Sequence, residues 1–503
     1  MVQKIDTGAG HALYGITRTR QIETSAQASL PPNTLMQRAG LAVAQLALAL
    51  APHARRIWIA CGPGNNGGDG LEAALQLLRL GKPATVTWLG NPQQMPADTA
   101  LACQRISAAG IRMAAEPEGD FDLCIDALLG IGTELREPQG RMANWMQRLN
   151  ASPAMVLAVD IPSGLHADTG AATQLHVKAT HTLSLLTLKP GLFTAQGRDA
   201  AGSVWLDPLG LQPPAADDRQ TTARLLARSM PAPRAHSSHK GSFGDVAVVG
   251  GAPGMTGAAL LAASAALHAG AGRVFVGLLD DQAPQLNVQQ PELMFRQVSQ
   301  MDFSSMTLVC GCGGGAAIHA MLPALLSTPS PLVVDADALN AMATDKLLQT
   351  GLTDRVARRL KTVLTPHPLE AARLLGRTAH QVQHDRLNAA QALAAQFGCT
   401  VVLKGSGTVI AAPGQITAIN PTGNARLATA GTGDVLAGMV GAHLAAGMSA
   451  FDAACQAVYW HGQMADQWPA SQPLTAGQLA RLAAPLTPAG LGALLSKHQN
   501  TIE

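Results

Sequence analysis

Two glycine-rich segments that each contain an acidic residue near their C-terminal end are the parts of this chain best suited to chemistry. The first is Gly64–Gly70, which contains Asp69, and the second is Ala430–Asp434. A glycine run ahead of an apolar helical pattern leaves backbone N–H groups free at a helix N-terminus, where aligned peptide dipoles favour an anion such as phosphate. Because the segments lie near opposite ends of the chain, they predict two active sites.

The elements that must position these segments alternate along the chain. Short apolar runs such as Ala84–Trp88 and Arg273–Leu278 read as strands, and helical patterns such as Gly70–Leu80 lie between them. This alternation predicts βαβ units, in which polar residues just after strand ends face the ligand crevice. We therefore expect an α/β fold class.

The 503 residues exceed what one hydrophobic core usually supports, so the length indicates two domains. Between Asp207 and His239 the composition shifts to proline pairs, Asp217-Asp218 and a serine and histidine cluster, with little apolar periodicity. We interpret 209–235 as a linker between a domain at 1–208 and a domain at 236–503.

The charge and the cysteine content of the chain argue against several classes of binding partner. The net charge of +2, from 35 basic and 33 acidic residues, is too small to indicate a nucleic acid or an anionic membrane surface. Seven scattered cysteines without a Cys-x-x-Cys pair suggest neither a disulfide framework nor a thiolate zinc site. The longest apolar stretch, Leu41–Ala51, is too short to span a bilayer, so we expect a cytoplasmic protein with small-molecule partners.

The first glycine segment follows the strand pattern at residues 56–60 and fits neither common nucleotide loop. It lacks the Gly-Lys-Ser/Thr of a Walker A loop and the spacing of Gly-x-Gly-x-x-Gly. Alone, it is also explained as a tight turn with Asp69 in the first turn of a helix. Three further segments after strand ends favour a site, namely Asp126–Arg136, Val159–Gly164 and Thr187–Gly191.

Together with Leu35–Gly40, these segments resemble the YjeF N-terminal domain, the NAD(P)H-hydrate epimerase family, over about residues 16 to 208. The resemblance implies a Rossmann-like three-layer sandwich that binds hydrated NAD(P)H, here NAD(P)HX. The residues it implies for substrate binding are Asn65, Asn66, Gly67, Gly68, Asp69, Gly130, Ile131, Gly132, Thr133, Glu134, Leu135 and Arg136. It also implies potassium ligands at Asn66, Asp126 and Ser163, which offer hard oxygen donors, and a substrate-binding acid at Asp160.

The chemistry of the hydrate also favours Asp160 as an acid–base residue. Water added at C6 of reduced nicotinamide makes a hemiaminal, whose configuration inverts through ring or C–O opening and reclosure with help from an acid and a base. Asp160, before a rigid Ile-Pro-Ser-Gly turn, fits that role with Lys189 as its charge partner. A structural aspartate that caps the turn is the alternative.

The second glycine segment precedes the apolar run Val435–His443, which places Asp434 in the first turn of a helix. Glycine amides there would stabilise the oxygens of a transferring phosphoryl group, and Asp434 would take the proton from an attacking hydroxyl. Alone, the same segment is equally a capped helix start.

Four more segments accompany it, Lys240–Asp245, Asp335–Asn340, Thr365–Glu370 and Lys404–Thr408. Together they resemble the ribokinase-like ADP/ATP-dependent NAD(P)H-hydrate dehydratase family over about residues 236 to 495. The resemblance implies a three-layer α/β domain with contacts to the hydrate from Ala258, Gly313, His367 and Asp434. It implies a nucleotide site at Lys404, Gly405, Ser406, Gly407, Thr408 and Gly433.

Some of these residues also fit a structural role. A histidine before proline, as at His367, is more often a hydrogen-bonded structural group. Asp335 and Asp337 fit solvated magnesium or the cap of a turn. The segment Cys310–Gly315 departs from the Gly-Pro-Gly-Leu-Gly of the family, with Cys312 and Gly314 in place of proline and leucine. We expect that loop to be looser and its contact through Gly313 less preorganised.

The sequence thus predicts an enzyme, a bifunctional NAD(P)H-hydrate epimerase and ADP-dependent dehydratase that restores NAD(P)H and uses potassium and magnesium. We expect NADHX, NADPHX and ADP as its small-molecule partners and a homo-oligomer as its assembly. The alternative is a ribokinase-like kinase of a vitamin precursor with a non-catalytic N-terminal binding domain.

Overall fold

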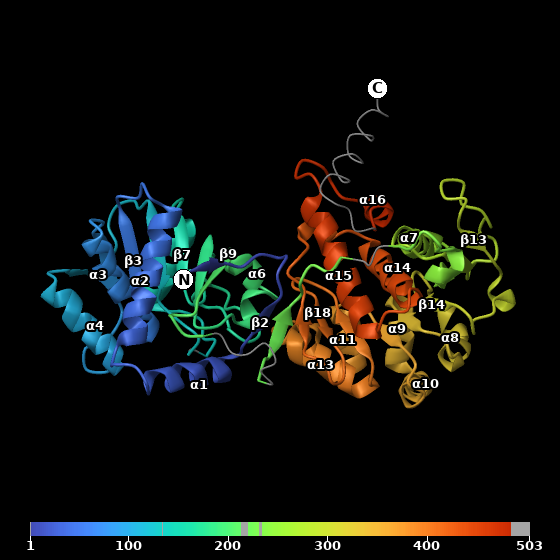
Figure 1. Ribbon diagram of the computed structural model, residues 1–503, viewed down its shortest axis with the longest axis horizontal. Coiled ribbons are helices and arrows are strands. Elements are labelled where there is room, and N and C mark those ends of the chain that lie inside the picture. The colour runs from blue at the N-terminus through green and yellow to red at the C-terminus, as the bar shows by residue number, and fades with distance from the viewer. Residues whose placement is uncertain (1, 133, 213–219, 231–233, 484–503) are drawn as a thin grey trace, which may run out of the picture. The chain divides into compact units, whose positions relative to one another are not determined.

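The computed structural model describes residues 2–132, 134–212, 220–230 and 234–483. The chain divides into two compact units, Met1–Leu225 and Leu226–Glu503, whose elements are labelled in Figure 1. The division falls inside the expected linker. Part of that segment is not a linker but a strand, because β10 (Ala223–Leu225) buries Ala223 and Leu225 and pairs antiparallel with β2 (His11–Leu13).

A mostly parallel sheet forms the centre of the first unit, in the order β1-β9-β8-β7-β6-β3-β4-β5. All neighbours are parallel except β1 and β9. The strands are β1 (Gln3–Lys4), β3 (Ile57–Cys61), β4 (Ala84–Trp88), β5 (Met113–Ala114), β6 (Leu123–Ala127), β7 (Met155–Val159), β8 (His181–Leu185) and β9 (Ser203–Asp207).

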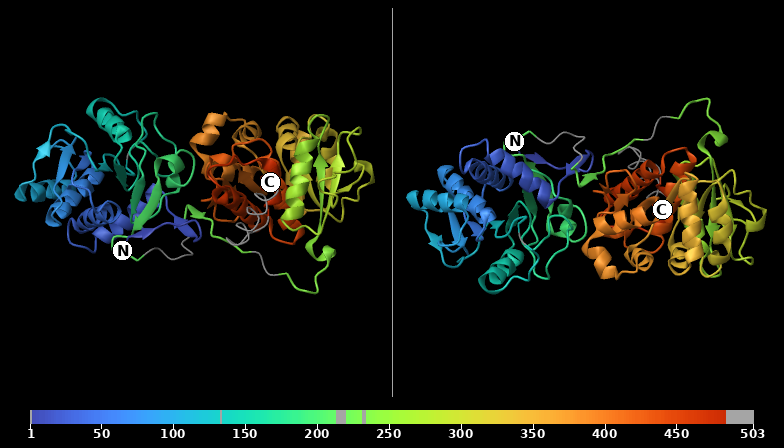
Figure 2. Two further views of the ribbon diagram at one scale, coloured as in Figure 1. Left: turned by 90° about the horizontal axis from the view of Figure 1, so that it is seen from above. Right: turned by 90° about the horizontal axis from the view of Figure 1, so that it is seen from below.

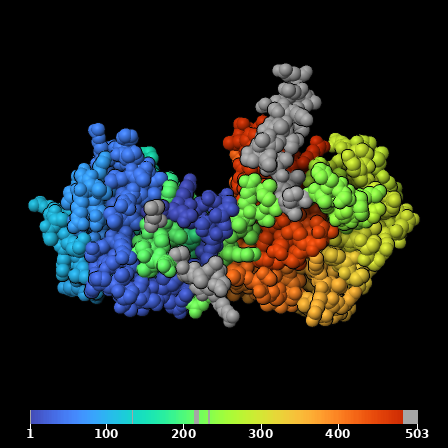
Figure 3. Space-filling view, in the orientation of Figure 1, coloured from blue at the N-terminus to red at the C-terminus, as the bar shows by residue number. Residues whose placement is uncertain are grey.

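Helices cover both faces of this sheet, which makes the unit a three-layer α/β sandwich. One apolar cluster joins Ile57 and Ile59 to α2, α3 and α4, and another joins Trp58 and Ala60 to α5, because alternate strand residues face opposite sides. Figure 2 shows α5, in teal, across the sheet from α2, and Figure 3 shows how the blue helices form much of the surface of this unit. The helices are α1 (Ile16–Gln27), α2 (Thr34–Leu50), α3 (Asn65–Arg79), α4 (Ala97–Ala108), α5 (Gly140–Ala151) and α6 (Gly197–Ala200).

The second unit has its own sheet, in the order β13-β12-β11-β14-β15-β16-β17-β18-β19, parallel from β13 to β17 and antiparallel beyond. The strands are β11 (Asp245–Gly250), β12 (Arg273–Leu278), β13 (Met294–Phe295), β14 (Thr307–Cys310), β15 (Leu332–Val334), β16 (Thr362–Leu364), β17 (Thr400–Leu403), β18 (Val409–Ala411) and β19 (Ala418–Ile419).

Helices α7, α14, α15 and α16 form one apolar cluster with strand residues such as Val248, Val363 and Val402. Helix α13 packs on β17 and β18, and α8 to α11 pack on one another. The helices are α7 (Thr256–His268), α8 (Ile318–Ser327), α9 (Ala336–Thr344), α10 (Lys346–Ala357), α11 (Pro368–Leu375), α12 (Ala379–His384), α13 (Arg386–Phe397), α14 (Thr432–Ala445), α15 (Ala450–Gln467) and α16 (Ala476–Arg481). Among the residues that the structure describes, no helix is both long and apolar enough to cross a bilayer.

Candidate active sites

A cavity of about 440 Å³ lies in the first unit where β3, β6, β7 and β8 end. Its wall includes residues from all three segments that the sequence singles out, and from α1 and α2. The predicted site residues that line it are Asn65, Asn66, Asp69, Gly130, Ile131, Gly132, Asp160 and Lys189. The carboxyl ends of the parallel strands thus bring together residues that are far apart in the chain, as open α/β sheets do.

The structure does not bring every predicted substrate residue to this wall. Gly67 and Gly68 are buried within α3, and Glu134, Leu135 and Arg136 are not among the lining residues. Arg136 instead forms a 2.8 Å ion pair with Glu134, and both side chains are exposed. Thr133 lies outside the described residues.

The glycines of the first segment permit close packing rather than a flexible loop. Helix α3 begins at Asn65, five residues before the expected start at Gly70, so the glycines belong to its first turns. A Cβ atom on Gly67 would lie 2.0 Å from the carbonyl oxygen of Gly62, and one on Gly68 would lie 2.5 Å from Cε of Met36. The helix start therefore fits against β3 and α2 only without side chains at these positions.

Asp160 and Lys189 form a buried ion pair at the cavity wall. The Lys189 ammonium donates to Oδ1 of Asp160 and, at 2.7 Å, to the carbonyl oxygen of Leu185. Oδ1 of Asp160 also accepts from the backbone N–H of Leu185 at 3.1 Å. Asp160 has a φ of +66° and its neighbour in the wall, Leu186, a φ of +64°. Left-handed backbone at two non-glycine residues is typical of functional sites.

Two further carboxyl groups line the same cavity, and the pKa of each is raised. Burial and the nearby Asp160 raise the pKa of Asp69 well above its usual range. Burial and Asp160 also raise the pKa of Glu23, on α1. Sequence analysis missed Glu23, because no motif surrounds it and only the packing of α1, through a 2.7 Å contact between the hydroxyls of Thr19 and Thr187, brings it here.

The three residues implied for potassium lie together beneath the cavity. The carboxylate of Asp126 accepts from the hydroxyl and the backbone N–H of Ser163 at 2.7 and 2.8 Å, and burial raises its pKa to about 6. The amide nitrogen of Asn66 donates to the carbonyl oxygen of Leu129 at 3.0 Å, while its buried Oδ1 has no hydrogen-bond partner. An orphaned amide oxygen beside a carboxylate and a hydroxyl fits an alkali cation.

In the second unit, α14 presents Asp434 in its first turn, as expected. Gly431 precedes the helix with a φ of +90°, which favours glycine. The Asp434 side chain is partly exposed, and burial together with the nearby Asp335 raises its pKa to about 6. His461 of α15 fixes this turn through a 2.9 Å contact between Nε2 and the carbonyl oxygen of Thr432.

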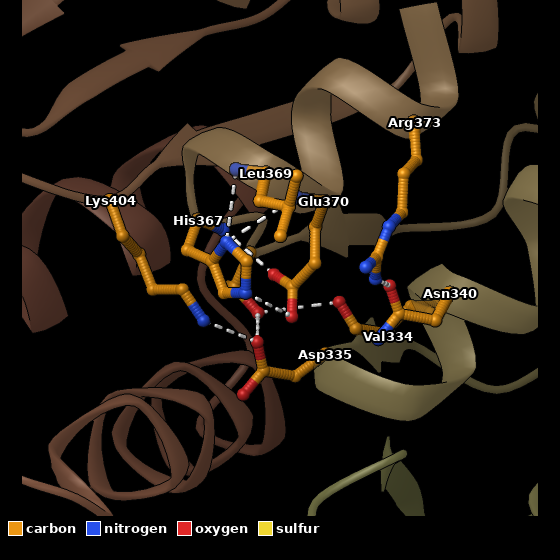
Figure 4. A network of polar contacts seen from close by, with 9 residues as sticks. Val334, Asp335, Asn340, His367, Leu369, Glu370, Arg373 and Lys404 are labelled. Atoms are coloured by element: carbon orange, nitrogen blue, oxygen red, sulfur yellow. Dashed lines mark hydrogen bonds and ion pairs between the residues drawn. The ribbon is translucent and has the colours of Figure 1, made fainter. Parts of the chain in front are cut away.

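Lys404, at the end of β17, holds the buried carboxylate of Asp335. Its ammonium lies 2.7 Å from Oδ1, which also accepts from the hydroxyl of Thr365 at 2.8 Å. Figure 4 shows Lys404 reaching this oxygen from the opposite side to Glu370. A Cβ atom on Gly433 would lie 3.3 Å from the Lys404 ammonium. Two residues predicted for the nucleotide, Lys404 and Gly433, are therefore adjacent.

The loop from Gly405 to Thr408 connects β17 to β18 and offers backbone to a ligand. Gly405 and Ser406 are exposed, and Gly405 has a φ of +134°. The hydroxyl of Thr408 donates to the carbonyl oxygen of Gly405 at 3.0 Å, which closes the loop.

His367 has the structural role that its sequence context favoured, and it also faces the site. Its Nδ1 accepts from the backbone N–H groups of Leu369 and Glu370, and the Glu370 carboxylate accepts from the His367 N–H at 2.7 Å, so the two residues cap α11 (Figure 4). Because Nδ1 is an acceptor, Nε2 bears the hydrogen, and it points to Oε1 of Glu370 at 3.2 Å. Burial and the nearby Lys404 lower the pKa of His367, and burial raises that of Glu370 to about 7.

The loop at Cys310–Gly315, whose sequence differs from the family pattern, is closely packed. A Cβ atom on Gly311 would lie 2.0 Å from the carbonyl oxygen of Asp335, and one on Gly314 would lie 2.7 Å from Cβ of Ile318. Gly313 is adjacent to Ala258, since a Cβ atom there would lie 2.9 Å from that of Ala258. Ile318 occupies the space that a side chain at 314 would take, while the lower preorganisation of the contact through Gly313 stays a prediction.

Asp335 and Asp337, the two acids that fit either magnesium or a cap, each use one carboxylate oxygen in an internal contact. Asp335 binds Lys404 and Thr365 through Oδ1, and Oδ2 of Asp337 accepts from the backbone N–H of Gly315 at 2.8 Å. Asp337 thus supports the Gly315 turn.

Two family profiles match the chain. The one described as NAD(P)H-hydrate dehydratase matches residues 246–486, and the one described as YjeF-related protein N-terminus matches residues 32–191. The chain is 37% identical to the bifunctional NAD(P)H-hydrate repair enzyme Nnr of Escherichia coli, over 86% of this chain and 84% of that protein. It is 35% identical to the enzyme of the same name from Coxiella burnetii, over 90% and 94%. It is 46% identical to the ADP-dependent (S)-NAD(P)H-hydrate dehydratase of Neisseria meningitidis, over 50% of this chain and 86% of that protein.

Proposed function

The chain belongs to the family of bifunctional NAD(P)H-hydrate repair enzymes, and we propose that its two units divide the two reactions between them. The first unit interconverts the R and S forms of NAD(P)HX. The second unit dehydrates the S form to NAD(P)H and converts ADP to AMP and phosphate. The relatives that match across most of the chain are named as NAD(P)H-hydrate repair enzymes, which favours this activity over the kinase alternative.

The carboxyl groups of the first cavity support an acid and a base for epimerisation. Asp160 pairs with the Lys189 ammonium, whereas burial and the nearby Asp160 raise the pKa of Asp69, which favours its protonated form. Asp69 donates its proton to the leaving C6 hydroxyl, the ring nitrogen shares its electron pair with C6, and Asp160 accepts a proton from water that adds on the other face. If the ring opens instead, Asp160 accepts the proton of the hydroxyl while Asp69 donates one to the ring nitrogen as the bond between C6 and nitrogen breaks, and reclosure reverses both transfers.

Potassium would be held by Asn66, Asp126 and Ser163, whose oxygens include the orphaned Oδ1 of Asn66. When bound, the cation would supply positive charge beside the substrate phosphates. We propose that Gly130 to Gly132, which line the cavity next to Asn66, bind the nucleotide part of the substrate.

In the second unit, Asp434 accepts the proton of the C6 hydroxyl as that oxygen attacks the terminal phosphate of ADP. The amides at the start of α14 and the Lys404 ammonium stabilise the charge on the transferring group. The ring nitrogen electron pair then expels the phosphorylated oxygen as phosphate, and loss of a proton from C5 to the solvent restores the dihydropyridine. Ala258, Gly313 and His367 would contact the hydrate in this arrangement.

The nucleotide itself would lie against the Gly405–Thr408 loop, where exposed backbone adjoins Lys404. We propose that magnesium enters with the nucleotide and takes its ligands chiefly from phosphate oxygens and water. This fits the engagement of Asp335 and Asp337 in internal contacts.

The observation that supports this proposal most directly is the presence of one perturbed carboxyl site in each unit, Asp69 with Asp160 in the first and Asp434 with Lys404 in the second. The test is incubation of the full chain with mixed R and S NADHX, ADP and magnesium. We expect both epimers to be consumed, with one AMP and one phosphate per NADH formed. Consumption of the S epimer alone would contradict the role of the first unit, and formation of a stable phosphorylated product would contradict that of the second.

We also propose that the chain acts in the cytoplasm as a homo-oligomer. All seven cysteines are free of disulfides, which agrees with a reducing compartment. Light scattering during size-exclusion chromatography tests the oligomeric state.

A further inference from the structure

The tertiary structure gathers three metal-binding side chains that the sequence keeps apart. One ligand atom each from Cys312, Asp335 and Asp434 lies within 4.8 Å of the other two. They come from the end of β14, the end of β15 and the start of α14. The chain has no Cys-x-x-Cys pair, so sequence spacing gave no sign of this group.

The chemistry of the group differs from that of an ordinary acidic cluster. Cys312 is fully buried, and its thiol donates a hydrogen bond to the carboxylate of Asp434. Asp335 is 1% exposed, and Lys404 and Thr365 both bind its Oδ1. Both of these donors bind Oδ1, and Figure 4 shows the second oxygen of Asp335 turned away from Lys404 and from Glu370. The carboxylate thus keeps a second oxygen for a ligand near the thiol.

The charge balance of the group also favours a divalent cation. The Lys404 ammonium pairs with Asp335 and also attracts the Asp434 carboxylate. When a dication displaces the proton of the Cys312 thiol, the dication and Lys404 together neutralise the three anionic ligands. Thiolate selects zinc over magnesium, which prefers oxygen ligands alone.

We propose that Cys312, Asp335 and Asp434 bind one thiophilic divalent cation of the zinc class, and that the bound cation inhibits the second unit. The Zn–S bond replaces the S–H bond of Cys312, and the proton passes to the solvent. Ligand atoms around tetrahedral zinc lie about 3.5 Å apart, so the group closes by about 1 Å. The partly exposed Asp434 is the ligand through which the cation enters.

Inhibition follows because the cation occupies the carboxylate that accepts the proton of the hydrate. This part of the inference rests on the proposed dehydratase function, whereas the binding of the metal does not. The cavity of the first unit contains none of the three ligands, so epimerisation should continue in the presence of the metal.

Binding is tested with cobalt as a spectroscopic substitute for zinc in the full chain without substrate. We expect a thiolate-to-cobalt charge-transfer band that saturates at one cobalt per chain and that zinc abolishes. The band should disappear in Cys312→Ser and persist in Cys455→Ser, a matched control that removes a thiol from α15. Absence of the band from the wild-type chain, or an equal band in Cys312→Ser, would overturn the proposal whatever the stability of the variant.

Inhibition is tested with S-NADHX as substrate, with magnesium and ADP in large excess over zinc. Zinc should inhibit the wild type and Cys455→Ser equally. Its potency against Cys312→Ser should fall more than about tenfold, because loss of even an outer-shell partner of a metal ligand typically costs that much affinity. Undiminished dehydration in metal-saturated wild type would overturn the inhibitory role. A cobalt band that depends on Cys312 in a chain without dehydratase activity would instead refute the proposed function and leave the metal site in place.

Discussion

The ammonium of Lys404 lies 2.7 Å from Oδ1 of Asp335, although 69 positions separate the two residues in the chain. Parallel β15 and β17, with β16 between them, end at one edge of the sheet and bring the pair together. This ion pair adjoins the start of α14, so it links the predicted nucleotide loop to the proposed proton acceptor.

Replacement of Lys404 by methionine should therefore affect both stability and nucleotide use. The buried Asp335 carboxylate would lose its counter-ion, which should cost about 3 kcal/mol of unfolding free energy. Urea unfolding measures this loss, and the KM for ADP should rise in parallel. The matched control Lys346→Met, on exposed α10, should change stability by less than about 0.5 kcal/mol. Equal effects of the two variants would refute the importance of the pair.

The proposed role of Asp434 as proton acceptor predicts that its replacement reduces dehydration and leaves epimerisation unchanged. Asp434→Asn keeps the shape of the side chain but cannot accept a proton, so dehydration of S-NADHX should slow by at least about a hundredfold. Chromatography of the two epimers should show unchanged R and S interconversion. Asp354→Asn, at an exposed position of α10, serves as control and should retain both activities. A dehydratase rate in Asp434→Asn close to the wild-type rate would exclude this residue as the proton acceptor.

The first unit should show the opposite selectivity. Asp160→Asn and Asp69→Asn should each slow interconversion of the epimers by at least about a hundredfold, because one removes the base and the other the acid. Dehydration of pure S-NADHX should remain at the wild-type rate in both. The exposed Asp120→Asn is the control. If Asp69→Asn interconverted the epimers at the wild-type rate, another group would have to be the acid, and Glu23 would be the first candidate.

Glu370 should make the second unit less stable as pH rises. Burial raises the pKa of Glu370 from 4.5 to about 7, so the folded state favours the protonated carboxyl. Below pH 4.5 the contribution of Glu370 to the free energy of unfolding is complete. This contribution, about 3 kcal/mol, is lost as pH rises through about 7.

Glu370→Gln should remove this contribution to the pH dependence, because glutamine does not ionise. Urea unfolding at a series of pH values measures it, and the exposed Glu292→Gln should keep the wild-type profile. Profiles of Glu370→Gln and wild type that run parallel between pH 4.5 and 7 would contradict the assignment.

Many of the strands could be predicted from local sequence because each is a short apolar run between turn residues. Ala84–Trp88 and Arg273–Leu278 form strands with the predicted bounds. The strand β8, His181–Leu185, was missed, because threonine and serine interrupt its apolar pattern and only burial between β7 and β9 makes it a strand.

The start of α3 was misplaced because glycine is a poor helix former on its own. Gly67 and Gly68 lie within α3, where a Cβ atom would meet Gly62 and Met36, so packing favours glycine at this helix start. Local preference alone therefore placed the helix five residues late.

The sequence by itself determined the α/β class, the two glycine-containing helix starts and the identity of Asp160, Asp434 and Lys404 as candidates, because these depend on local periodicity and on motifs contiguous in the chain. Only the tertiary structure placed Glu23 beside Asp69 and joined Cys312 to two aspartates. Those groupings arise where separate strands and helices converge, and their electrostatics depend on burial, which neighbours remote in sequence create.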